Sequence, residues 1–328
     1  MASPRGRVLV LGDANIDLTL HVPARQPDGR RAVREPVVSV GGTAANTARA
    51  LGALGVPVSF AGAVGDDAFG RHVARDLAAA GVDVSALVVT QADATCEVIA
   101  MIEPDGERSL VVWPADGGAL RWLRPEDVPG DAVAKAAWIH TTGMCLRDSP
   151  VRDTVLTVMA HARAAGVPVS IDLNLRLELW GIDAERRAAV ERAIALADVV
   201  LGSGPEELVP LAGATGLRPS GAGLVEVEAA AHALSGGART VVARMGGDGA
   251  LACAPDGSLV RSPAFGVAVA NVIGAGDAFN AGFIAARAEG RGLFEALRWG
   301  NAVAARKVAR PAGSPDLPTR PEVEALLA

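Results

Sequence analysis

The stretch that decides the fold of this chain is NVIGAGDAFNAGF, residues 271–283. Gly274 and Gly276 bracket Ala275 in a short turn, and from Asp277 onward apolar residues recur at helical spacing. A glycine-lined turn that leads into a helix leaves backbone N–H groups pointing outward at the positive end of the helix dipole. The stretch therefore predicts a site for a phosphate, or for the anionic transition state of phosphoryl transfer.

Asp277 lies in the first turn of this predicted helix, beside the anion pocket. A carboxylate repels a bound phosphate, so its place there makes sense if it takes a proton from an attacking hydroxyl group. Alternatively, Asp277 caps the helix, as Asp often does. The stretch by itself does not decide between these two roles.

Residues 274–282, GAGDAFNAG, resemble the C-terminal signature of the PfkB, or ribokinase-like, family of sugar and nucleoside kinases. The resemblance implies that the turn of Gly274, Ala275 and Gly276 is the anion hole and that Asp277 is the catalytic base. It also implies the fold class, which is a ribokinase-like α/β fold. This fold has a doubly wound, mostly parallel sheet with helices on both faces and a small β-sheet lid.

The rest of the chain agrees with this fold class. Short apolar runs that are typical of buried parallel strands alternate with helical patterns, and these runs lie at residues 8–12, 58–63, 138–140, 169–172, 199–202 and 240–243. Other strand-like runs do not fit the alternation, and a hairpin turn is predicted at residues 103–107. We therefore expect one domain, residues 1–328, with lid strands contributed by about 18–40 and 95–113.

Polar side chains follow the first predicted strand at every second position. If the strand continues, Asp13, Asn15 and Asp17 share one face, which suits a hydroxyl-rich ligand because carboxylates accept from pairs of sugar hydroxyls. A polar turn is the commoner fate of such a cluster. The family resemblance favours the first interpretation and implies that Asn15 and Asp17 hold the sugar.

The segment GGTAAN, residues 41–46, opens the next predicted helix. Paired glycines let a ligand approach the backbone closely, and Asn46 would face the same space. The segment resembles the N-terminal signature of the family, which implies that Gly41, Gly42 and Asn46 contact the sugar.

Two arginines are further candidates for substrate binding. Arg108, just past the hairpin turn, could reach a substrate from the lid or be a solvated charge at the sheet edge. Arg176 belongs to a D-x-N-x-R run, followed by Leu179 and Trp180, that resembles 2-keto-3-deoxygluconate kinases and bacterial fructokinases. Its guanidinium could pair with a carboxylate or phosphate in a bidentate manner, or form a salt bridge to Asp172 or Glu178.

The resemblance also implies a nucleotide site along the later strands. Ser203 and Glu206 stand where the family has N-x-x-E, in which the Glu binds magnesium through water near the phosphates. The loop RMGGDG, residues 244–249, matches the nucleotide-phosphate loop of the family, although alone it would be an ordinary β-turn. The cofactor-binding residues implied in this way are Ser203, Glu206, Arg244, Gly246, Gly249 and Asn301, the last beside the adenine.

The implied cofactors are ATP and Mg²⁺. A monovalent cation such as K⁺ is doubtful, because Asn271 replaces an Asp that commonly helps to hold this cation in the family. Residues 313–314 lie in a loop that could help to bind it.

Composition limits the partners. The 328 residues carry a formal charge of −6 and a sequence pI near 5.5, which argues against nucleic acid or an anionic membrane as the main partner. No apolar run has the length of a membrane span, and residues 1–7 lead directly into a strand, too short for a signal peptide, so we expect a cytoplasmic protein. The expected partners are a small sugar, ATP, and a second copy of the chain bound through the lid.

We therefore expect an ATP-dependent sugar kinase that moves the γ-phosphate to a hydroxyl of a ketose or 2-keto-3-deoxy sugar acid by direct in-line transfer, with Asp277 as base. The alternatives are a nucleoside kinase of the same family and a non-catalytic sugar-binding regulator. A dinucleotide-dependent oxidoreductase would need G-x-G-x-x-G after the first strand, where this chain has GDAN at residues 12–15.

Overall fold

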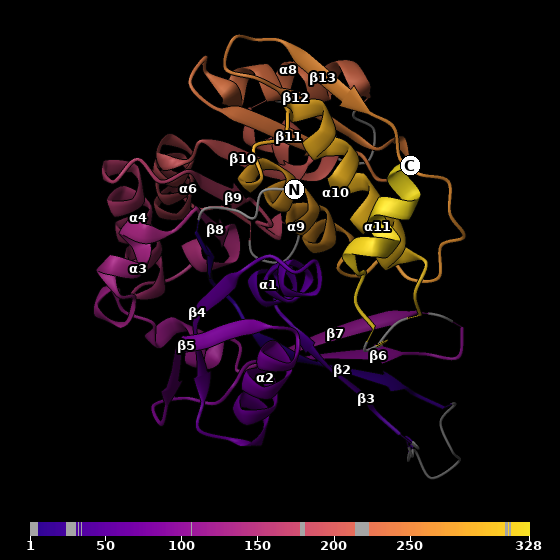
Figure 1. Cartoon of the computed structure of the whole chain (residues 1–328). Coiled ribbons are helices and arrows are strands. Elements are labelled where there is room, and N and C mark those ends of the chain that lie inside the picture. Colours follow the sequence, from indigo (N-terminus) through magenta and orange to yellow (C-terminus); the bar gives the residue numbers. More distant parts are fainter. Residues whose placement is uncertain are drawn as a thin grey trace.

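The computed structural model describes residues 6–23, 31, 33, 35–105, 107–177, 181–213, 223–311, 314 and 316–328. A nine-stranded sheet with helices on both faces forms the body of the molecule, and a separate four-stranded sheet lies at one end of it (Figure 1). This arrangement confirms the predicted fold class.

The large sheet has the strand order β13-β12-β11-β10-β9-β8-β1-β4-β5. The neighbouring pairs among β5, β4, β1, β8, β9, β10 and β11 are all parallel. The strands β12 and β13 extend this sheet with antiparallel pairs at the edge next to β11. The strands are β1 (Val8–Leu11), β4 (Val58–Gly65), β5 (Val82–Thr90), β8 (Trp138–Thr142), β9 (Val169–Asp172), β10 (Val199–Ser203), β11 (Thr240–Arg244), β12 (Ala250–Cys253) and β13 (Leu259–Ser262).

Helices cover both faces of this sheet because its central strands are apolar on both sides. In β1, Val8 and Val10 pack into one hydrophobic core, whereas Leu9 and Leu11 pack into the other. The helices are α1 (Thr43–Ala53), α2 (Ala68–Ala79), α3 (Gly130–Lys135), α4 (Val151–Ala164), α6 (Ala184–Leu196), α7 (Val209–Leu211), α8 (Leu224–Ser235), α9 (Ala275–Ala288), α10 (Leu293–Val308) and α11 (Arg320–Leu327). None of the helices described here is both long enough and apolar enough to cross a membrane.

The small sheet corresponds to the predicted lid. It consists of β2 (Asn15–His21), β3 (Val37–Gly41), β6 (Glu97–Ile102) and β7 (Arg108–Trp113), in the order β3-β2-β6-β7. The β2–β6 pair is parallel, and the two outer pairs are antiparallel. The first strand does not continue as expected, because β1 ends at Leu11, residues 12–14 belong to no strand and β2 begins at Asn15. Asn15 and Asp17 share one face of β2, whereas Asp13 lies in the connection between the two strands.

Candidate active site

The turn at residues 274–277 has the geometry of an anion-binding site. Gly274 precedes α9 with φ of +75°, a left-handed conformation that favours glycine, and it provides no side-chain cap. Within the part of the chain that the structure describes, the amide groups of Gly276 and Asp277 have no hydrogen-bond partner. Two free N–H groups at the positive end of a 14-residue helix can therefore receive an anion.

The Asp277 carboxylate does not cap its own helix. Its Oδ2 accepts a hydrogen bond of 2.9 Å from Nδ2 of Asn46, which lies on α1. The pKa of Asp277 is raised to about 7, first because burial disfavours the charged form and then because Asp172 is negatively charged, while the Asn46 bond acts in the opposite direction. A carboxylate with a pKa near neutrality is suited to accept a proton from a hydroxyl group.

Asp13 is held by the protein around it. Its carboxylate accepts hydrogen bonds from the backbone of Thr43 (2.6 Å) and Ala44 (3.2 Å) at the start of α1 and from Oγ1 of Thr142 (2.9 Å) at the end of β8. Asp13 therefore joins the carboxyl ends of β1 and β8 to the N-terminus of α1, next to the Asn46–Asp277 pair.

The predicted sugar residues come together at the base of the lid. Nδ2 of Asn15 donates to Oδ1 of Asp17 at 2.7 Å. A Cβ at Gly41 would lie 2.5 Å from the Asp17 carboxylate, and one at Gly42, where φ is +97°, would lie 2.5 Å from the carbonyl oxygen of Asp13. The close approach of other parts of the chain thus explains both glycines, and Gly41 leaves room for the Asp17 carboxylate.

A buried ion pair lies beneath the anion-binding turn. The Arg244 guanidinium, at the end of β11, donates to Asp172 at 2.7 Å and to Asn280 at 2.6 Å, and Asn280 donates to Asp172 at 2.8 Å. Although burial alone would lower it, the pKa of Arg244 is raised, because Asp172 and Glu207 are negatively charged. A Cβ at Gly276 would lie 3.4 Å from Arg244 Cζ, so the Arg244 guanidinium packs against the turn at Gly276.

The carboxyl end of β10 carries two adjacent glutamates with different environments. Glu207 is mostly buried and accepts backbone hydrogen bonds of 2.8 Å from Leu175 and Ser203, and its pKa is raised by burial and by Asp172. Glu206 is exposed and accepts a hydrogen bond from the Ser203 hydroxyl. A single exposed carboxylate fits Mg²⁺ bound through water, because this ion keeps several waters and takes few protein ligands.

The predicted nucleotide loop forms a turn after β11. Gly246 and Gly249 have φ of +56° and +89°, and a Cβ at Gly249 would lie 2.2 Å from the carbonyl oxygen of Ser262. Asn301, on α10, donates to the carbonyl oxygens of Ser262 (3.0 Å) and Pro263 (3.1 Å), so its amide supports the segment after β13.

The two predicted substrate arginines have different surroundings. Arg176 is exposed beyond β9 with φ of +49°, and it forms no ion pair with the residues that the structure describes. Asp172 pairs with Arg244 instead. Arg108 begins β7 opposite Ile102, but its side chain lies outside the described residues, as do residues 178–180 and 313.

Sequence reasoning misses three residues of this region: Glu207, Asn280 and Lys307. Glu207 lies next to Glu206, and Asn280 lies within residues 274–282. Their hydrogen bonds to Leu175 and Asp172 depend on the fold and are not visible in the sequence. Lys307 had a signal of its own, since the chain contains only two lysines.

Comparison with known proteins agrees with this geometry. The family model described as pfkB family carbohydrate kinase matches residues 5–320. The chain is 33% identical over 281 residues to a fructokinase of Klebsiella pneumoniae (85% of this chain, 84% of that protein) and 33% identical over 322 residues to an ATP-dependent ribose-1-phosphate kinase of Halopiger xanaduensis (98% of each). A double-mutant fructokinase from Vibrio cholerae, solved with fructose, ADP and potassium ion bound, is similar in structure, with a TM-score of 0.79, 27% identity and 100% of each chain covered.

Proposed function

Since this chain belongs to the PfkB family of carbohydrate kinases and is an ATP-dependent kinase, we propose that it transfers the γ-phosphate of ATP directly to a hydroxyl group of a small sugar. The observation that carries the proposal is the Asp277 carboxylate, which has a pKa of about 7 and lies beside free amide groups at the start of α9. The same turn thus provides a base for the acceptor hydroxyl and a binding site for the phosphoryl group.

Proton transfer and phosphoryl transfer proceed together in this mechanism. Asp277 takes the proton of the acceptor hydroxyl, and the alcohol oxygen forms a bond to the γ-phosphorus as the bond to the bridging oxygen of ADP breaks. The amides of Gly276 and Asp277 donate to the equatorial oxygens, where they stabilise the charge of the transition state. Glu206 and Ser203 would hold Mg²⁺ through water, and this ion neutralises charge on the phosphates when bound.

The substrate class that we favour is a ketose or a 2-keto-3-deoxy sugar acid. Asn174 donates to the Thr43 hydroxyl, and the Thr43 amide in turn donates to Asp13, so the segment after β9 is tied to the base of the lid. Arg176 follows Asn174 by two positions and is exposed, so we propose that its guanidinium reaches the predicted sugar site and pairs with a substrate carboxylate.

A panel of acceptors with ATP tests this proposal. The four acceptors are fructose, which is a neutral ketose, 2-keto-3-deoxygluconate, which is an acidic sugar, ribose 1-phosphate, which is a sugar phosphate, and a nucleoside. Fructose or 2-keto-3-deoxygluconate should give the highest kcat/KM. Arg176→Ala should reduce kcat/KM for an acidic sugar by about tenfold or more, because the substrate carboxylate loses its charged partner. The kcat/KM for a neutral sugar, which has no carboxylate, should stay nearly unchanged. Arg187→Ala, in an exposed part of α6, is the control. Equal losses on both sugar types would contradict the role of Arg176, and preference for the nucleoside would contradict the substrate class.

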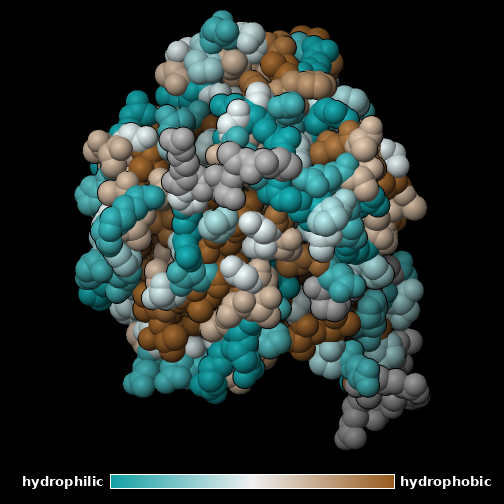
Figure 2. Space-filling view, in the orientation of Figure 1, coloured by the Kyte–Doolittle hydropathy of each residue, from teal (hydrophilic) through white to brown (hydrophobic). Residues whose placement is uncertain are grey.

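We also infer that two copies of the chain associate through their lids. One face of the lid exposes three apolar side chains at its edges, which are Val38 on β3 (43%) and Val111 (44%) and Trp113 (53%) on β7. Figure 2 shows apolar surface at the lower right, where the lid lies, as well as at the lower left. A second lid would cover these side chains, which favours the expected homodimer.

A further inference from the structure

Lys307 lies beside the anion-binding turn, at the end of α10. The neighbouring carbonyl oxygen of Val308 accepts hydrogen bonds from the amides of Ala270 (2.8 Å) and Asn271 (3.1 Å), so the end of α10 is fixed to the segment that leads into the turn. A Cβ built at Gly274 would lie 3.3 Å from Lys307 Cε and 3.9 Å from Asp277 Oδ2. The end of the lysine side chain and the catalytic carboxylate therefore border the same small volume.

No described residue forms a direct ion pair with Lys307. Among the residues that the structure describes, its ammonium group has no acidic partner and no hydrogen bond. The pKa of Lys307 is lowered, first by burial and then by the positive charge of Arg49, whereas Asp277 acts in the opposite direction. This half-buried ammonium is therefore available to an anionic ligand at the turn.

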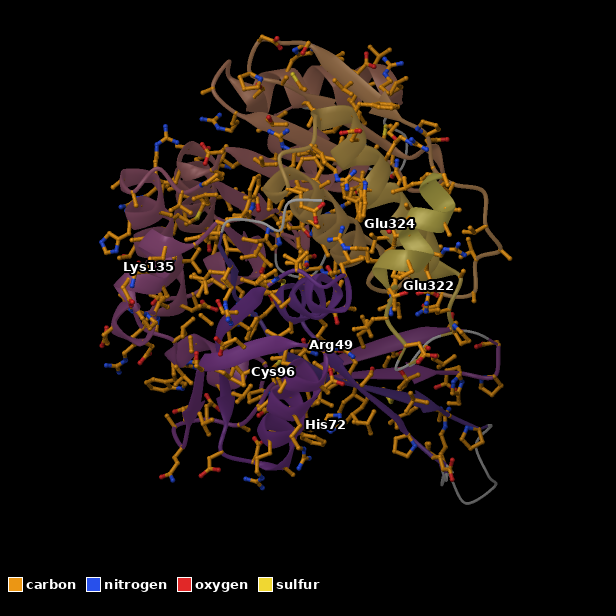
Figure 3. All side chains as sticks on the ribbon, viewed as in Figure 1. Arg49, His72, Cys96, Lys135, Glu322 and Glu324 are labelled. Atoms are coloured by element: carbon orange, nitrogen blue, oxygen red, sulfur yellow. The ribbon has the colours of Figure 1, made fainter. Side chains whose placement is uncertain are left out.

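The other nearby cations are already engaged. Arg49, on α1 (Figure 3), pairs with Asp76 at 2.5 Å, and Arg244 pairs with Asp172. Of the two described cations that border the turn at Gly274 and Gly276, Arg244 is thus committed to Asp172 and Lys307 is not.

Among the residues that the structure describes, Asn271 and Lys307 next to this turn do not fit a bound K⁺. A cation site needs anionic or carbonyl oxygen ligands. Asn271 is neutral, and its Oδ1 accepts a hydrogen bond from the amide of Ile273 at 3.2 Å. The fixed ammonium of Lys307 beside the same segment repels a second cation.

We propose that the ammonium group of Lys307 supplies, from within the chain, the positive charge that stabilises the transferring phosphoryl group at the Gly274 turn, so that transfer does not depend on K⁺. The inference rests on the proposed phosphoryl transfer at this turn. Lys307 forms and breaks no covalent bond, and the acceptor proton still moves to Asp277.

Kinetics in different salts test the proposal with a matched control. Lys307→Met keeps the length of the side chain and removes its charge, and Lys135→Met does the same at the other lysine, which is exposed on α3 and far from α10 (Figure 3).

The wild type should have the same kcat in K⁺ and in tetramethylammonium. Lys307→Met should lower kcat about 100-fold and move the acidic limb of its pH profile to higher pH, because the loss of a positive charge raises the pKa of Asp277. Lys135→Met should match the wild type. A wild type that needs K⁺, or a Lys307→Met variant with wild-type kcat and pH profile, would overturn the proposal.

Acetylation gives a second measurement, which does not require turnover or a variant that folds. Acetic anhydride modifies both lysines of the wild type, and mass spectrometry follows each site. MgATP should slow modification of Lys307 by about tenfold or more and leave Lys135 unchanged, because a bound phosphate covers the first ammonium only. Equal rates at Lys307 with and without MgATP would overturn the role of Lys307. Protection of Lys307 in a chain that phosphorylates no acceptor would contradict the proposed function while leaving the phosphate contact supported.

Discussion

At the scale of single residues, burial, Asp172 and the Asn46–Asp277 hydrogen bond together set the pKa of the proposed base. Asn46 stabilises the charged carboxylate, whereas burial and Asp172 destabilise it, and the balance leaves the pKa at about 7. Asp277 accepts a proton only when it is ionised, so activity should fall as the pH decreases through this pKa.

Removal of that hydrogen bond should move the acidic limb in a defined direction. In Asn46→Ala the charged form of Asp277 loses its donor, so its pKa rises and the limb of kcat/KM moves upward by about one pH unit. Profiles of kcat/KM against pH measure the shift. Thr47→Val is the control, because the Thr47 hydroxyl is 3.5 Å from the backbone oxygen of Asp277 and not from its carboxylate. An unchanged limb in Asn46→Ala would contradict this explanation of the pKa.

At the scale of elements, Arg244 joins three parts of the fold beneath the turn. It extends from β11 to Asp172 at the end of β9 and to Asn280 in α9. Removal of one partner of a buried ion pair is costly, because it leaves the other charges uncompensated.

Arg244→Met should therefore lower the free energy of unfolding by about 3–5 kcal/mol, because Asp172 and Glu207 lose their common cation. Urea denaturation measures the difference. Arg261→Met breaks an exposed pair with Glu228 and should cost at most about 1 kcal/mol. Equal stability of the two variants would show that the Arg244 pair does not hold these elements together.

Local patterns in the sequence predict most of this architecture, because the turn of residues 274–277 and the short apolar strands are visible within a few residues. They do not predict β5, β12 or β13: β5 is an edge strand that carries Asp83 and Ser85, so it lacks the continuous apolar run of a buried strand. They also miss the pairing of partners that are far apart in the chain. Asp172 and Arg244 are separated by 72 positions, and Asn46 and Asp277 by 231, so only the folded sheet brings them together.

At the scale of the whole molecule, the residues of the predicted site come from both the lid and the body. β2 carries Asn15 and Asp17 on the lid, whereas α9 carries Asp277 on the body (Figure 1). Closure of the lid would exclude water from the phosphoryl group and suppress hydrolysis of ATP. An association of two lids would therefore affect the site as well as the surface.

The proposed lid-to-lid dimer can be tested by a single charge. Val111→Glu places a carboxylate in the exposed apolar surface of β7, so it should convert a dimer into a monomer, because burial of an unpaired charge is unfavourable. Sedimentation velocity measures the mass. Val225→Glu, at a 75% exposed apolar position on α8, should remain a dimer. A monomeric wild type, or a dimeric Val111→Glu variant, would contradict the lid interface.

The most direct test of the central claim is single-turnover phosphoryl transfer by Asp277→Asn with MgATP and a saturating acceptor, with ATP affinity measured in parallel by calorimetry. The substitution keeps the shape of the side chain and removes its ability to take a proton. Our account predicts a rate about 10²–10⁴-fold lower with ATP affinity nearly unchanged. A rate close to that of the wild type would contradict it.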